Sequence, residues 1–145
     1  IKPAAIESKT GVVGVLATAG TFNGRLYNET KAKFAKNVTI IATVADEFVD
    51  LVERGLTSGL EAERIVREKI EPLLAARCDK IVLGCTHFPH LKSLIEKVAG
   101  NKAEIIEPSQ AVALRAKYIL KNANLMNDAR LEPRHIFIST KKDCD

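Results

Sequence analysis

Several residue types that mark particular classes of protein are scarce or absent in this chain of 145 residues. It has no tryptophan, and no apolar run approaches the roughly 18 residues that are needed to cross a bilayer. The first nine residues, IKPAAIESK, hold neither an initiator methionine nor the charged and then apolar segment of a signal peptide. We therefore expect no membrane partner, and the opening isoleucine indicates that an upstream part has been removed.

Basic runs are also missing, although lysine and arginine outnumber aspartate and glutamate by 22 to 18 and the formal net charge is +4. The two signs are interspersed, and aromatic side chains that could stack on bases make up only 5% of the chain. A solvated surface of mixed charge is the better interpretation, so we expect no nucleic-acid partner.

Cysteine is limited to Cys78, Cys85 and Cys144. Their number is odd, and their spacing matches neither a disulfide framework nor a zinc finger. Reduced thiols in the cytoplasm are therefore favoured over a secreted protein.

What the sequence does contain is an alternation of short apolar runs with longer helical patterns. The runs are rich in β-branched residues and lack polar alternation, which is typical of strands buried on both faces of a parallel sheet. They are Gly11–Leu16, Val38–Thr43, Lys80–Gly84 and Glu104–Glu107, with His135–Thr140 as a last strand. This order predicts an α/β fold around a mostly parallel sheet.

Helices are predicted between these strands. Ser58 and Glu61 form the pattern of a capping box, and Pro72 is expected to kink or restart the helix that follows. The predicted helices are Asn23–Ala35, Glu47–Arg54, Ser58–Ala76, Pro89–Gly100 and Ser109–Lys121. Ligands of such sheets bind beyond the carboxyl ends of the strands. The loops of interest are therefore Ala17–Thr21, Val44–Asp46, Cys85–Phe88 and Pro108–Gln110.

The strongest local signal is GCTHFPHL, residues 84–91. Cys85 would leave a buried strand just before a helix begins, where the helix dipole and unpaired amides stabilise a thiolate. His87 could donate a proton or a hydrogen bond, and Thr86 supplies a hydroxyl and an amide. The alternative is a small, inert, buried cysteine. A zinc site that adds His90 and Glu53 is a third interpretation, but its spacing matches no closed structural site.

Two other segments carry weaker signals. The turn Ala17–Thr21 offers two hydroxyls and several amides at a helix start, which could cradle a carboxylate or a phosphate, although such turns are often structural. It lacks the ending of a Walker loop. Glu53, taken alone, is interpreted as a surface acid.

Together these segments resemble the glutamate racemases of the aspartate/glutamate racemase superfamily. The matching stretches, in family order, are Val12–Thr21 with Tyr27, Phe48–Gly55, Ile81–Leu91 and Ile105–Ala113. The resemblance implies a three-layer, doubly wound sheet that forms one of two pseudo-symmetric racemase domains. It also implies an isomerase without cofactor or metal that interconverts L- and D-glutamate in the bacterial cytoplasm, for peptidoglycan synthesis, cell wall biogenesis and cell shape.

Racemisation removes a proton from one face of the α-carbon and returns one to the other face, so an acid/base cysteine is needed on each side. By resemblance, Cys85 deprotonates L-glutamate, with His87 and Glu53 as further catalytic residues. The resemblance likewise implies that Thr86, Thr18 and Thr21 contact the substrate, and that no metal is bound.

The opposing cysteine is not expected in this chain. Cys78 precedes the strand that Cys85 follows, which separates the two by about 20 Å, and Cys144 lies in a polar tail. In the family the second cysteine lies on an upstream domain. The resemblance therefore divides the chain into a second racemase domain, residues 1–98, and a segment, residues 99–145, that completes the first domain.

These assignments imply that the chain alone is inactive and that the upstream domain is its partner. An exposed domain face would also allow a homo-oligomer. Two alternatives stay open: a non-catalytic module that binds a ligand or another protein, and a racemase of aspartate or another amino acid.

Overall fold

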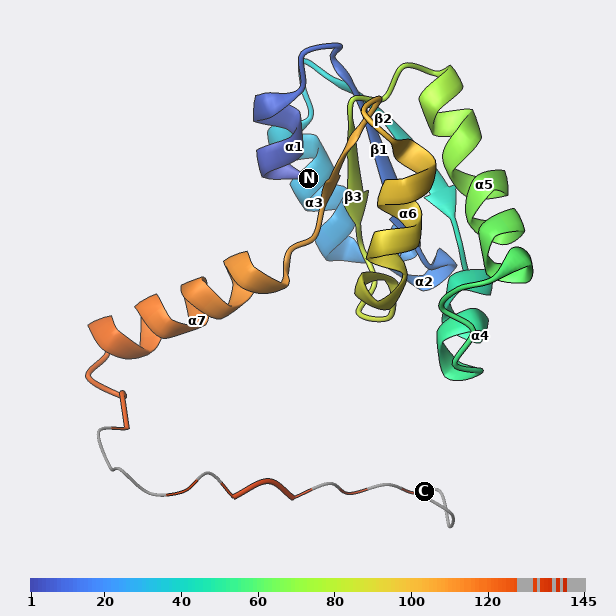
Figure 1. The fold of residues 1–145 in the computed structure, drawn as a ribbon. Coiled ribbons are helices and arrows are strands. Elements are labelled where there is room, and N and C mark those ends of the chain that lie inside the picture. Colours follow the sequence, from blue (N-terminus) through green and yellow to red (C-terminus); the bar gives the residue numbers. More distant parts are fainter. Residues whose placement is uncertain (128–131, 133, 137, 139, 141–145) are drawn as a thin grey trace. The chain divides into compact units, whose positions relative to one another are not determined.

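A computed structural model of the chain describes residues 1–127, 132, 134–136, 138 and 140. It divides into two compact units, Ile1–Ala111 and Val112–Asp145. The first unit contains a sheet with its covering helices, and most of helix α7 (Ser109–Asn122) belongs to the second (Figure 1). Within the described part of the chain, no helix is both long and apolar enough to span a membrane.

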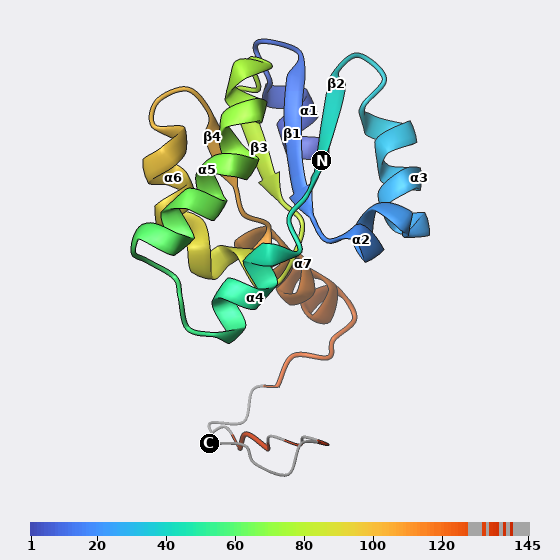
Figure 2. The ribbon, with the colours of Figure 1, turned by 90° about the vertical axis from the view of Figure 1, so that its right-hand side faces the viewer.

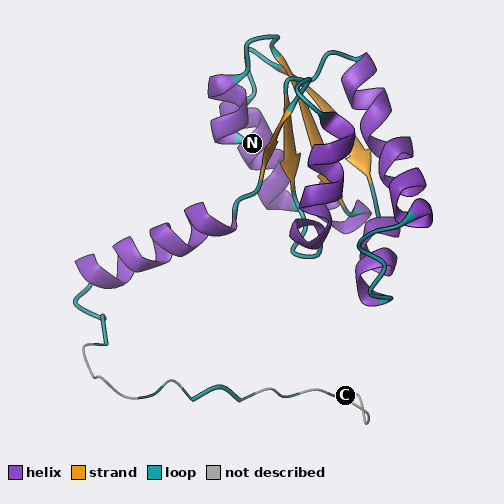
Figure 3. Cartoon of the chain, in the orientation of Figure 1, coloured by secondary structure: helices purple, strands orange, loops and turns teal. Residues whose placement is uncertain are grey.

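The first unit is built on four parallel strands in the order β2-β1-β3-β4 (Figure 3). Val13 on the central strand β1 pairs with Ile40 on one side and Lys80 on the other. The strands are β1 (Val12–Ala17), β2 (Thr39–Val44), β3 (Lys80–Leu83) and β4 (Glu104–Ile106). The prediction of these four strands is confirmed. The described residues of the fifth prediction, 135, 136, 138 and 140, are not in a strand, and its other residues lie outside the described part.

The helices cover both faces of the sheet. Helices α1, α2 and α3 lie on one face, and α4, α5 and α6 lie on the other (Figure 2). Their bounds are α1 (Lys2–Glu7), α2 (Ala19–Asn23), α3 (Arg25–Phe34), α4 (Glu47–Glu53), α5 (Leu60–Ala75), the 3-10 helix η1 (Phe88–Leu91) and α6 (Lys92–Ala99). This is the three-layer, doubly wound α/β architecture that the resemblance implied.

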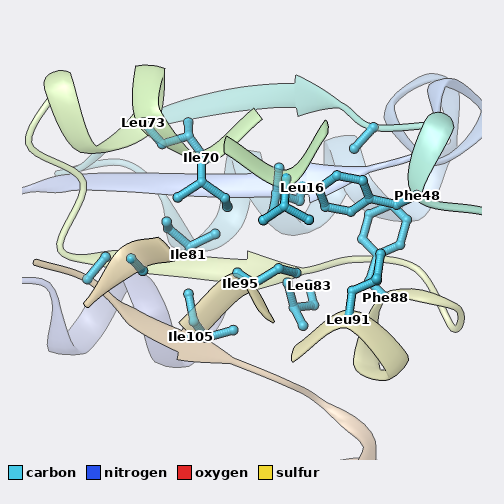
Figure 4. Close-up of a cluster of buried hydrophobic side chains, with 14 of the residues drawn as sticks. Leu16, Phe48, Ile70, Leu73, Ile81, Leu83, Phe88, Leu91, Ile95 and Ile105 are labelled. Atoms are coloured by element: carbon cyan, nitrogen blue, oxygen red, sulfur yellow. The ribbon is translucent and has the colours of Figure 1, made fainter. Parts of the chain in front are cut away.

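Alternating side chains of the strands build two cores. On β1, Val13 and Val15 face the layer of α1 to α3, whereas Leu16 faces the larger core under α4 to α6. In that larger core the rings of Phe48 and Phe88 pack edge to face with centroids 5.2 Å apart (Figure 4). Full burial of one such side chain contributes about 1.5–3 kcal/mol. The core thereby fixes α4 and η1 at the carboxyl end of the sheet.

Three helix predictions were wrong in detail. The predicted helix Asn23–Ala35 is instead two helices that meet at Gly24, whose extended backbone (φ −72°, ψ 141°) interrupts them. Ser58 and Glu61 form no capping box, because α5 begins after Gly59, at φ +92°, and Glu61 pairs with Arg54. Helix α5 continues through Pro72.

Two further differences lie near helix starts. The segment after Cys85 enters the short 3-10 helix η1 before α6 begins, so the regular helix begins later than predicted. Helix α1 was not predicted, although Pro3 is at a position that favours a helix start.

The compact units do not divide at the predicted domain boundary after residue 98. Strand β4 pairs with β3, and Ala99, Ala103 and Ile105 are buried in the core of the first unit. The sheet unit therefore extends to Ala111. That the later part of residues 99–145 completes another domain stays a prediction.

Candidate active site

The candidate site lies where the direction of strand addition reverses. From β1 the chain goes out to β2 on one side, and then returns past β1 to β3 and β4 on the other. The loops after β1 and β3 consequently diverge to opposite faces of the sheet, which is where ligands bind in doubly wound folds. Thr18–Thr21 follows β1, and Cys85–His87 follows β3.

Gly84 brings the end of β3 close to the end of β1. Its amide donates to the carbonyl of Leu16 at 2.7 Å. A Cβ at this position would lie 3.0 Å from that carbonyl oxygen and 3.1 Å from the Cβ of Ala17. Glycine thus allows the close approach that places Cys85, which is partly buried, two positions after the last residue of β3.

A row of three side chains leads away from the thiol. The Cys85 Sγ lies 3.9 Å from Nδ1 of His87, and Nε2 of His87 lies 2.7 Å from Oε1 of Glu53. An ionised carboxylate can only accept, so Nε2 carries the shared proton, and Nδ1 of a neutral imidazole then faces the sulfur as an acceptor. This arrangement can take the thiol proton and stabilise the resulting imidazolium.

Glu53 is exposed over 67% of its side chain, so the interpretation as a surface acid describes its accessibility correctly. Its position is nevertheless defined by α4, whose Phe48 and Leu51 are buried. Periodicity gave no sign of the contact with His87, because 34 positions separate the two residues. The resemblance alone singled Glu53 out.

The turn after β1 brings two threonine hydroxyls together. Thr18 Oγ1 and Thr21 Oγ1 lie 3.1 Å apart, and the Thr21 amide donates to the Thr18 carbonyl at 3.0 Å. Asp46, from the loop after β2, accepts from the amide of Ala19 at 3.1 Å. Sequence reasoning selected the loop Val44–Asp46 but gave Asp46 no role.

A hollow of about 380 Å³ adjoins both loops within the first unit. Its wall is mostly apolar and includes Thr21, in the turn after β1, and Gly84, which directly precedes Cys85. Thr21 and the segment leading into Cys85 therefore border one space. The other lining residues include Val15, Tyr27, Leu83 and Pro108.

The remaining candidates are less constrained. Thr86 is exposed, and its side chain makes no hydrogen bond to another described residue. His90 is exposed, and its amide donates to the carbonyl of His87. Among the described residues no group of three or more His, Cys, Asp and Glu could hold a metal ion. The four candidate zinc ligands are therefore not gathered into a metal site.

Cys78 lies at the other end of β3, just before Lys80, and is buried in the larger core. Burial, with a smaller effect of the neighbouring Asp79, raises the pKa of the Cys78 thiol above its ordinary value. A thiol that is harder to ionise and lies at the opposite edge of the sheet cannot serve the same substrate as Cys85. Cys144 lies outside the described residues.

Comparison with known proteins gives consistent results. A family model described as Asp/Glu/Hydantoin racemase matches residues 3–116. The glutamate racemase of Pseudomonas syringae pv. tomato is 36% identical over 126 residues, which cover 87% of this chain and 46% of that protein. The glutamate racemase of Herpetosiphon aurantiacus is 39% identical over 127 residues, covering 88% of this chain and 50% of that protein.

Solved structures agree. A glutamate racemase isoform from Bacillus anthracis has a TM-score of 0.76 and 26% identity, covering 87% of this chain and 47% of that one. Escherichia coli glutamate racemase, in complex with L-glutamate and the activator UDP-MurNAc-Ala, has a TM-score of 0.73 and 32% identity. The match covers 83% of this chain and 46% of that one. The chain spans about half the length of the curated relatives it matches.

Proposed function

This chain belongs to the Asp/Glu/Hydantoin racemase family, and from that premise we propose that it forms the part of a glutamate racemase that holds one of two catalytic cysteines. The reaction interconverts L- and D-glutamate without cofactor or metal. In the bacterial cytoplasm it supplies D-glutamate for peptidoglycan synthesis, and so for cell wall biogenesis and cell shape. The row of contacts from Glu53 through His87 to Cys85 carries the proposal.

Proton transfer would begin at Cys85. The α-proton of glutamate is weakly acidic because an ionised carboxylate adjoins it, so the base must be a thiolate rather than a thiol. His87 Nδ1 takes the thiol proton, and Glu53 stabilises the imidazolium from the other side of the ring. The thiolate then removes the α-proton of L-glutamate. In the reverse direction the Cys85 thiol returns a proton to the same face.

Substrate binding would rest on the two loops that flank the switch point. The hydroxyls of Thr18 and Thr21 lie 3.1 Å apart and can both donate to one carboxylate. Thr86 follows the catalytic cysteine directly, and its exposed hydroxyl and amide are available to the substrate. Glutamate is therefore held on one side by the turn after β1 and on the other by the turn after β3.

The second base requires a complementary half. Among the described residues no other cysteine accompanies Cys85 at this edge of the sheet, so we expect the chain alone to be inactive. Helix α7 carries apolar side chains that stay exposed, and we propose that this part of residues 99–145 packs on the missing upstream domain. These side chains are Val112, Leu114, Tyr118, Ile119 and Leu120. Left uncovered, such a surface would favour a homo-oligomer.

The test is racemisation of each glutamate enantiomer, followed by chiral chromatography, by the chain combined with the complementary half of a related glutamate racemase. We expect racemisation to require both pieces and to disappear in Cys85→Ala. Cys78→Ala is the matched control, because it removes a thiol at the opposite end of β3 and should retain turnover. Racemisation that survives Cys85→Ala would refute the assignment.

The same assay addresses the substrate. The name of the matching family includes aspartate, so aspartate belongs in the panel beside glutamate. Turnover of aspartate without glutamate would replace the proposed substrate. Binding of glutamate without any turnover, by an assembled pair of halves, would favour a non-catalytic ligand-binding module.

A further inference from the structure

A short helix, α4, connects the two loops of the candidate site. Asp46, just before its first residue, contacts the turn after β1, and Glu53, its last residue, contacts His87 in the turn after β3. Seven helical residues rise by roughly 10 Å. Burial of Phe48 and Leu51 anchors the helix between these ends. Two carboxylates on one anchored helix thus reach the loops proposed for substrate binding and for proton transfer.

The contact of Asp46 supplies a helix cap that the turn itself lacks. Thr18 precedes α2, yet its side chain makes no capping bond. The amide of Ala19 instead donates to Oδ1 of Asp46, across 27 positions. Because the first amides of a helix have no partner inside it, this bond holds the turn and leaves the Thr18 hydroxyl beside that of Thr21.

We propose that Asp46 is a positioning residue for substrate binding, holding the turn so that the hydroxyls of Thr18 and Thr21 converge on one substrate carboxylate. The inference rests on the proposed function, because the ligand of the turn is the proposed glutamate. Gly20 lies in the first turn of α2, where a residue without a side chain adds backbone flexibility. A turn that is already held loses less conformational entropy when the substrate binds, so Asp46 acts on KM more than on kcat.

The contact itself can be tested on the 145-residue chain, independently of activity. Amide hydrogen exchange of Ala19, measured by NMR, should speed up by about five-fold in Asp46→Ala, as expected for the loss of one hydrogen bond. Asp46→Asn keeps an acceptor oxygen and should retain the protection. Asp50→Ala is the matched control, because it removes a carboxylate from the exposed face of the same helix. Unchanged exchange in Asp46→Ala would overturn the proposal.

The role in binding is tested by steady-state kinetics of the chain assembled with the complementary half. Asp46→Ala should raise KM for L-glutamate by about five-fold, with kcat changed by less than about two-fold. Asp46→Asn and Asp50→Ala should match the unmodified protein. An unchanged KM in Asp46→Ala, or an Asn variant as impaired as the Ala variant, would overturn the positioning role. Absence of turnover in the unmodified assembly would instead refute the proposed function, and the role of Asp46 in substrate binding with it. The amide exchange of Ala19 would still show whether Asp46 holds the turn.

Discussion

Glu53 at the end of α4 and His87 in the turn after β3 meet at 2.7 Å, although 34 positions separate them in the chain. The edge-to-face packing of Phe48 on Phe88 fixes this meeting, because Phe48 belongs to α4 and Phe88 directly follows His87. A buried aromatic pair thereby sets the geometry of an exposed polar pair. The imidazole is in turn oriented toward the sulfur of Cys85.

Replacing Glu53 by glutamine should slow racemisation through its effect on His87. The amide is similar in size but carries no charge to stabilise an imidazolium, so we expect kcat to fall by at least about ten-fold, as when a catalytic histidine loses its carboxylate. Steady-state rates of the assembled halves would measure the effect. Asp50→Asn removes the same charge from the same helix without touching His87. An equal fall of kcat in the two variants would contradict a specific effect of Glu53 on His87.

Gly84→Ala should destabilise the fold by about 1–3 kcal/mol, the usual cost of overpacking. The added Cβ would lie 3.0 Å from the carbonyl oxygen of Leu16 and 3.1 Å from the Cβ of Ala17, both on the central strand. Urea unfolding would give the change in the free energy of unfolding. Gly20→Ala is the comparison, because a Cβ there meets no atom within 4 Å. An unchanged free energy of unfolding in Gly84→Ala would show that β1 and β3 lie farther apart than the structure places them.

Asp79 should stabilise the fold in a pH-dependent way. Desolvation acts to raise its pKa, but hydrogen bonds from Ser8, Lys9 and Thr10 outweigh that effect and hold the pKa at about 2. Because the pKa is lowered in the folded state, the contribution is complete above the unfolded value near 4 and is lost as the pH falls toward 2. Because the carboxyl group is partly exposed, solvent screening reduces this contribution to about 1 kcal/mol at neutral pH.

Urea unfolding of Asp79→Asn at pH 7 and at pH 3 tests this expectation. The variant should be less stable than the unmodified chain at pH 7, and the difference should shrink at pH 3. Glu68→Gln, which alters an exposed ion pair on α5, should change stability little at either pH. If Asp79→Asn lowers the free energy of unfolding by the same amount at pH 7 and at pH 3, the proposed role of the carboxylate is contradicted.

Tyr27→Phe should stabilise the protein. The Tyr27 hydroxyl is buried without a hydrogen-bond partner among the described residues, and desolvation raises its pKa. Removing it relieves a penalty of about 1 kcal/mol, while the edge-to-face contact with Phe22 is retained. Thermal unfolding would measure the gain. Tyr118→Phe, at a residue that is 56% exposed, should be neutral; a loss of stability in Tyr27→Phe would indicate a partner for the hydroxyl.

The sheet could be predicted because its signal is local. Strands such as Val12–Ala17 and Lys80–Leu83 are buried on both faces, and their unbroken apolar runs reveal this directly. Helix starts were predicted less well, because competing contacts decide them. Glu61 pairs with Arg54 instead of capping α5, and a glycine at φ +92° precedes the helix.

The candidate site was predictable only in part. The position of Cys85 and a proton-donating role for His87 were predicted from the motif that follows a buried strand, whereas the proposed role of Glu53 came from the resemblance alone. The contact between Asp46 and Ala19 joins loops of different strands, so no pattern within either loop could reveal it. Side chains brought together by the strand order become visible only once the sheet is built.

Exchange of the α-proton of L- and D-glutamate in heavy water, observed by NMR, tests the central claim most directly. The account predicts exchange when the chain is combined with the complementary half, none with the chain alone, and none in the combination that carries Cys85→Ala. Exchange that persists without the Cys85 thiol, or its absence from an assembly shown to be folded and associated, would contradict the assignment of Cys85 as the base.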